Sequence, residues 1–131
     1  MFKKIDHVEI IPGDFEKTIR FFTEILGFKV KQRLGITHPP MEEIAFLELN
    51  GTLLEIISVK NPSPPSTEPW QVSYKRIALE VEDMDKAIKY LKSKGVKITQ
   101  ESRTLPTSKR AEIEGPDGLS LELRQWFSGE G

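Results

Sequence analysis

The chain is organised around the stretch Ile5-Asp6-His7-Val8-Glu9-Ile10 and a later counterpart, Arg76-Ile77-Ala78-Leu79-Glu80-Val81. Both alternate a polar or small side chain with an aliphatic one, which is the pattern of a half-buried strand. Alternate side chains of a strand point to opposite faces, so His7 and Glu9 share the face that meets water. We expect the chemistry of the protein on that face.

The first half of the chain predicts elements in the order β-α-β-β-β. Asp14 is a good N-cap, and apolar side chains follow at helical spacing up to Gly27, a typical helix end. Asn50-Gly51 joins two later apolar runs and is the strongest short signal for a β-hairpin. The predicted elements are a strand at 5–10, a helix at 15–26, and strands at 28–34, 44–49 and 53–59.

The second half repeats this order after a proline-rich segment. Four prolines in residues 61–69 are incompatible with a helix interior or a central strand, so this segment is a predicted linker. Arg76 lies 69 residues after His7, and after a short deletion Glu122 lies 67 residues after Glu55. The predicted elements are a strand at 76–81, a helix that Asp83 caps and Gly95 ends, and strands at 96–100, 111–114 and 119–125.

The repeat predicts an α+β fold. A βαβββ unit has one sheet face covered by its helix and one bare face, so two units must cooperate to enclose a cavity. We therefore expect residues 1–131 to form a single domain of two βαβββ modules, at 1–60 and 70–126, joined by the linker 61–69. The two sheets are expected to form a half-open eight-stranded barrel.

Composition narrows the function. The net charge of the 131 residues is -1, with acids and bases spread evenly, which argues against nucleic acid or membrane partners and favours a small-molecule ligand. The absence of cysteine excludes disulfides, thiolate metal sites and a cysteine nucleophile. No apolar stretch is long enough to cross a bilayer, and the first residues lack a signal-peptide core. We expect a soluble, cytoplasmic protein.

Four polar side chains occupy matching places in the two halves. His7 and Arg76 begin the two first strands, and Glu55 and Glu122 lie on the two last strands, flanked by apolar neighbours. Strand alternation predicts that all four project from the bare sheet faces and converge near a pseudo-twofold axis. One imidazole and two carboxylates suit a divalent cation such as Mn, Fe, Co, Ni, Zn or Mg.

The sequence resembles the vicinal oxygen chelate superfamily over nearly its whole length. That superfamily includes glyoxalase I, methylmalonyl-coenzyme A epimerase, extradiol dioxygenases and bleomycin or fosfomycin resistance proteins. The motifs that carry the resemblance are Ile5-Asp6-His7-Val8, Phe21-Phe22 before Leu26-Gly27-Phe28, Phe46-Leu47-Glu48-Leu49 before Leu54-Glu55-Ile56, Ile77-Ala78-Leu79-Glu80-Val81, and Gly115-Pro116-Asp117-Gly118 before Leu121-Glu122-Leu123.

The resemblance implies His7, Glu55 and Glu122 as metal ligands, and a further ligand, usually histidine, where this chain has Arg76. Arginine stays protonated and has no lone pair for a cation. Two alternatives stay open. Either Arg76 turns away or hydrogen-bonds a carboxylate while three ligands hold a more open metal site, or its guanidinium group replaces the metal by pairing with Glu55 or Glu122.

The resemblance also implies a function. The leading hypothesis is a homodimeric, metal-dependent lyase or isomerase of the glyoxalase or epimerase type, which removes a proton from carbon next to an oxygen on the metal. The proton-accepting carboxylate would be Glu122, or Glu55 by the pseudo-symmetry. Glu9 shares the face of His7, but solvation or pairing with Arg76 or Arg124 is the interpretation we prefer for it.

A second hypothesis makes the protein a non-catalytic small-molecule-binding protein of the bleomycin-resistance type, in which Arg76 replaces the metal. Whether the protein is an enzyme therefore stays open at this point. Dioxygenase activity fits less well, because it needs a second histidine at the position that Arg76 occupies.

Overall fold

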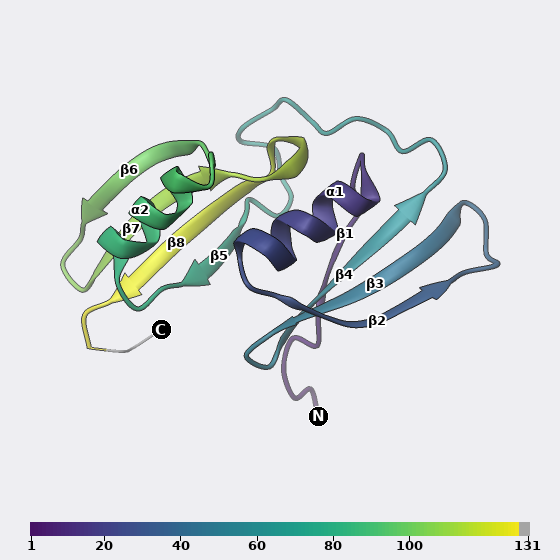
Figure 1. Ribbon diagram of the computed structural model, residues 1–131, viewed down its shortest axis with the longest axis horizontal. Coiled ribbons are helices and arrows are strands. Elements are labelled where there is room, and N and C mark those ends of the chain that lie inside the picture. Colours follow the sequence, from purple (N-terminus) through teal and green to yellow (C-terminus); the bar gives the residue numbers. More distant parts are fainter. Residues whose placement is uncertain (129–131) are drawn as a thin grey trace. The chain divides into compact units, whose positions relative to one another are not determined.

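A computed structural model describes residues 1–128, and the chain divides into two units, Met1–Pro65 and Ser66–Gly131. Each unit contains one four-stranded sheet and one helix that packs against it (Figure 1). Among the described residues, no helix combines the length and the apolar character that a membrane span needs.

The helix of the first unit begins where the sequence predicts. The Asp14 side chain accepts a hydrogen bond from the backbone N–H of Lys17 at 3.0 Å, so it caps α1 (Phe15–Arg20). The helix then widens into a π-helical turn, η1 (Phe21–Ile25), which the sequence did not predict. It ends at Gly27, whose φ of +85° is the left-handed conformation that glycine adopts without strain.

The first sheet has the strand order β1-β4-β3-β2. Its first strand runs parallel to the last one, and the other neighbours are antiparallel. Asn50 and Gly51 both have positive φ and form the predicted two-residue turn between the third and fourth strands. The strands are β1 (Val8–Ile10), β2 (Lys29–Gly35), β3 (Met41–Leu49) and β4 (Thr52–Val59).

The core of this unit lies between the helix and one face of the sheet. Ala45, Leu47 and Ile56 are fully buried, as is Phe22 from the helical segment. Side chains alternate along β3 and β4, so the residues between these core positions, including Glu55, face away from the helix. The helix therefore leaves the other sheet face open for polar groups.

The second unit repeats this arrangement. Asp83 caps the helix by accepting from the backbone N–H of Lys86 at 3.0 Å, and the strand order is β5-β8-β7-β6 with the first pair parallel. The α+β fold class with two βαβββ modules is therefore confirmed. Its elements are β5 (Ile77–Glu80), α2 (Met84–Ser93), β6 (Ile98–Thr104), β7 (Ser108–Glu114), the short 3-10 turn η2 (Pro116–Gly118) and β8 (Ser120–Trp126).

The strands differ from the prediction mainly at their ends. β1 starts at Val8, so His7 precedes the strand. β6 and β7 extend well beyond the predicted strands and close a hairpin in which the Leu105 N–H donates to the Ser108 carbonyl at 2.7 Å. Residues 101–110 are mostly polar, so this hairpin shows no apolar alternation that could have predicted it.

Replacement of a core side chain tests the assignment of the buried face. Leu47→Ala removes a fully buried side chain and is expected to lower the free energy of unfolding by about 3 kcal/mol. Val30→Ala is the matched control, because Val30 is the cross-strand partner of Leu47 but is 46% exposed. Urea titration followed by circular dichroism measures both. Equal losses for the two variants would contradict the assignment.

Candidate functional site

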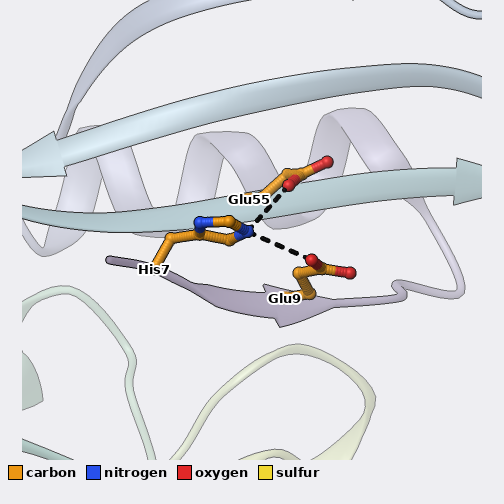
Figure 2. A group of neighbouring side chains, drawn as sticks. All are labelled: His7, Glu9 and Glu55. Carbon is orange, nitrogen blue, oxygen red and sulfur yellow. Dashed lines mark hydrogen bonds and ion pairs between the residues drawn. The ribbon is translucent and has the colours of Figure 1, made fainter. Parts of the chain in front are cut away.

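Three carboxylates surround the imidazole of His7 in the first unit. Nδ1 lies 2.9 Å from an Asp6 oxygen, and Nε2 lies 3.1 Å from oxygens of both Glu9 and Glu55. Figure 2 shows one ring nitrogen facing both glutamates, which come from adjacent strands. The structure thus brings together His7 and Glu55, two of the residues that the sequence predicts for a metal site.

The strand register positions these groups. In the parallel pairing of β1 with β4, Glu9 is the direct partner of Glu55, so their side chains emerge next to each other on the same face. His7 comes two residues before Glu9 and so reaches the same place. The Phe46 ring meets the imidazole edge-on, with 5.9 Å between ring centroids, and limits its rotation.

The electrostatics of this group favour a cation. Hydrogen bonds to Asp6 and Glu9 raise the pKa of His7. Burial raises the pKa of Glu55, and the negative charge of Glu9 adds to that effect. One imidazole is too little positive charge for three carboxylates at this distance, so the group attracts a further cation.

The donor atoms also fit a divalent metal ion. One ligand atom from each of His7, Glu9 and Glu55 can be chosen so that all three lie within 4.8 Å of one another. An imidazole nitrogen with carboxylate oxygens is a donor set used by Zn, Mn, Fe, Co and Ni. Because Asp6 accepts from Nδ1, Nε2 remains as the atom that can bind the metal, an arrangement common in metal sites.

The matching positions of the second unit carry different chemistry. Arg76 donates from Nη1 to Glu112 at 3.1 Å, and Arg110 donates to Glu112 at 2.8 Å and to Glu122 at 2.7 Å. Arg124 donates from Nε to the other oxygen of Glu122 at 2.9 Å. Arg76 therefore hydrogen-bonds a carboxylate, as one alternative proposed, but its partner is Glu112, which neither alternative named.

Hydrogen bonds from Arg110 and Arg124 occupy both carboxylate oxygens of Glu122. Burial by itself would raise the pKa of Glu122, but hydrogen bonds from Arg110 and Arg124 outweigh burial and hold the pKa below its ordinary value. Both carboxylate oxygens face guanidinium groups, so a cation could bind Glu122 only after displacing them. The donor chemistry around Glu122 does not fit a metal ion, and its role as ligand or base stays a prediction.

The sequence did not predict the roles of several residues of the site. Glu9 is exposed to solvent, as the preferred interpretation expected, but its partner is His7 and not an arginine. Asp6 was given no role, because alternation in the strand predicted at 5–10 places it on the face opposite His7. In the structure β1 starts only at Val8, and the Asp6 carboxylate reaches the imidazole. Glu112 is the cross-strand partner of Glu122, as Phe46 is of Glu55, so extending the repeat to these partners would have found it.

Comparison with known proteins agrees with this fold. Residues 4–123 match the sequence profile of the Glyoxalase/Bleomycin resistance protein/Dioxygenase superfamily. The Bacillus subtilis protein YwkD is 35% identical over 126 residues, which cover 94% of this chain and 97% of YwkD. The lactoylglutathione lyase of Neisseria meningitidis serogroup A is 28% identical, and the match covers 95% of this chain and 91% of the lyase.

Among solved structures, a glyoxalase family protein from Enterococcus faecalis matches with a TM-score of 0.82 and 27% identity. The match covers 94% of this chain and 98% of that protein. The agreement of sequence profile, relatives and fold leads to one conclusion: the chain belongs to the Glyoxalase/Bleomycin resistance protein/Dioxygenase superfamily.

Proposed function

We propose that the protein is a metal-dependent enzyme of the glyoxalase type, a lyase or isomerase that removes a proton from a carbon next to a carbonyl group of a small molecule. The observation that carries this proposal is the convergence of His7, Glu9 and Glu55 on one place. Membership in the superfamily and the likeness to a lactoylglutathione lyase support the reaction type.

In this proposal the first unit supplies the metal ligands. His7 would bind through Nε2, and Glu9 and Glu55 through carboxylate oxygens, while Asp6 holds the imidazole by its Nδ1. A bound divalent ion supplies an electrophile that polarises a carbonyl group and stabilises the negative charge left when the proton departs. The donor set suits Ni, Co, Mn, Fe, Zn or Mg and does not choose among them.

Glu55 is the proton acceptor that the geometry favours. Burial raises its pKa, which makes it a stronger base than an exposed glutamate. It has two oxygens, so one can face the metal while the other accepts a proton. Glu122 is the weaker candidate base, because the two arginines that hold it lower its pKa.

The second candidate function is non-catalytic binding of a small molecule, as in the bleomycin-resistance type. The observation that favours it is Arg76, which stands where the resemblance implies a fourth metal ligand and pairs with Glu112. Under this alternative the metal experiment below gives no binding. A homodimer and a cytoplasmic location remain proposals. The first rests on the resemblance, and the lack of cysteine fits the second.

The reaction can be tested on lactoylglutathione, the compound after which the Neisseria relative is named. We expect the metal-loaded protein to catalyse deuterium incorporation from D₂O at the carbon bonded to the thioester carbonyl, measured by NMR. Glu55→Gln should slow this exchange by about 100-fold or more, because the general base is lost. If the parent protein exchanges deuterium no faster than Glu55→Gln, this substrate is excluded. The metal content of Glu55→Gln is measured as well, because loss of the ion would also slow the exchange.

Metal binding itself is tested on protein from which a chelator has removed any bound metal and from which the chelator has then been removed. We expect His7→Ala to lose calorimetric binding of Ni²⁺, Zn²⁺ or Mn²⁺. Asp6→Asn should weaken binding by about tenfold to 100-fold, because Asp6 orients the imidazole. Glu24→Gln, an exposed change in the same unit, is the charge-matched control. Absence of binding to the parent protein would remove the proposal.

Glu122→Gln tests whether the second unit contributes a ligand. We expect metal affinity to stay within twofold of the parent, and the free energy of unfolding at pH 7 to fall by about 3 kcal/mol, because two guanidinium groups lose their carboxylate. Since the pKa of Glu122 is lowered, its stabilisation is present above the ordinary value of 4.5 and fades as the pH falls further.

Chemical unfolding at several pH values, with Glu24→Gln as the control, measures this difference. A loss of metal affinity as large as that of His7→Ala would instead establish Glu122 as the ligand that the sequence predicts.

A further inference from the structure

Three arginines lie in one row across the second sheet. Arg103 on β6 pairs with Arg110 on β7, and Arg110 pairs with Arg124 on β8. Direct cross-strand partners point to the same face, and like charges in such pairs destabilise a sheet. This face lies opposite the one that α2 covers, because the residues between them, such as Ala111 and Leu123, are buried in the core.

The fold does not require arginine at these places. In the first unit, the cross-strand pair two residues away from Phe46 and Glu55 is Ile44 with Ile57. In the second unit, the pair in the same register relation to Glu112 and Glu122 is Arg110 with Arg124. The same topology thus forms with isoleucines at these positions. The arginine pair lowers the stability of the sheet without being needed for the fold, which points to a function.

Two arginines of this row, together with Arg76 from the residue before β5, surround two carboxylates. Glu112 accepts from both Arg76 and Arg110, and Glu122 accepts from both Arg110 and Arg124. Three guanidinium groups therefore share two carboxylates, and all five side chains are at most 23% exposed. A partly buried positive charge without its own counter-ion is unfavourable, so this cluster attracts an anion.

Of the three arginines around Glu112 and Glu122, Arg76 makes the fewest hydrogen bonds within the described residues. Its Nη1 shares the Glu112 oxygen with Arg110, and its Nε is buried with no hydrogen-bond partner in the described part of the chain. A buried donor without an acceptor costs free energy. A planar or tetrahedral oxyanion offers two acceptor oxygens in the geometry that a guanidinium fork recognises.

We propose that Arg76, together with Arg110 and Arg124, forms a binding site for the carboxylate or phosphate group of a small-molecule ligand. This inference rests on the proposed function only for the claim that the anion belongs to the substrate, which would then be an anionic compound. The binding of the anion itself depends on the second unit alone and is independent of any metal.

The test uses the full chain, stripped of metal and then desalted, because the chelator is itself a polycarboxylate. Inorganic phosphate and oxalate are titrated by calorimetry in Tris chloride at constant ionic strength. We expect saturable binding of at least one anion, and a loss of about tenfold or more in Arg76→Gln, because a charge-assisted hydrogen-bond pair is removed. Arg76→Lys, which keeps the charge but not the fork, should lose affinity in part.

Lys89→Gln is the matched control, since it removes one positive charge from the exposed surface of α2. Binding of phosphate alone indicates a phosphate ester, and binding of oxalate alone indicates a carboxylic acid. No binding of either anion, or an equal loss in Lys89→Gln and Arg76→Gln, overturns the proposal. Circular dichroism of each variant confirms folding, and failure of metal binding in the earlier experiment leaves this result unaffected.

Discussion

The parallel pairing between the first and last strand of each unit is the constraint on which the other features depend. It places Glu9 directly beside Glu55 and brings His7 to the same place. In the second unit the same pairing places Ala78 beside Glu122. The register of this parallel pair at the sheet edge therefore decides which side chains lie close enough to act together.

The two units share this backbone plan but carry opposite chemistry on the open face. The first gathers acidic groups around an imidazole, which suits a cation. The second unit has Glu112 where the first has Phe46, and a pair of arginines where the first has a pair of isoleucines. Its open face therefore carries guanidinium groups around two carboxylates. A duplicated fold can thus offer a cation site and an anion site without any change in topology.

The fold and half of the site could be predicted from the sequence. The spacing between the repeats and the helix caps gave the order of the elements, because period-two and helical patterns depend only on neighbouring residues. The meeting of His7 with Glu55 followed from strand alternation. The partners of Arg76 and Glu122 did not follow from strand alternation. Residues 101–110 show no apolar alternation, so the sequence did not reveal the strand pairing that brings Arg110 next to Glu122.

The π-helical turn of the first unit accounts for a difference in length between the two halves. From cap to closing glycine the first helical segment spans Asp14 to Gly27 and the second spans Asp83 to Gly95, so the first is one residue longer. An added residue would rotate all that follows in a regular helix by about 100°. The wider turn at Phe21–Ile25 absorbs that residue locally, so both halves can enter their second strand with the same orientation despite unequal lengths.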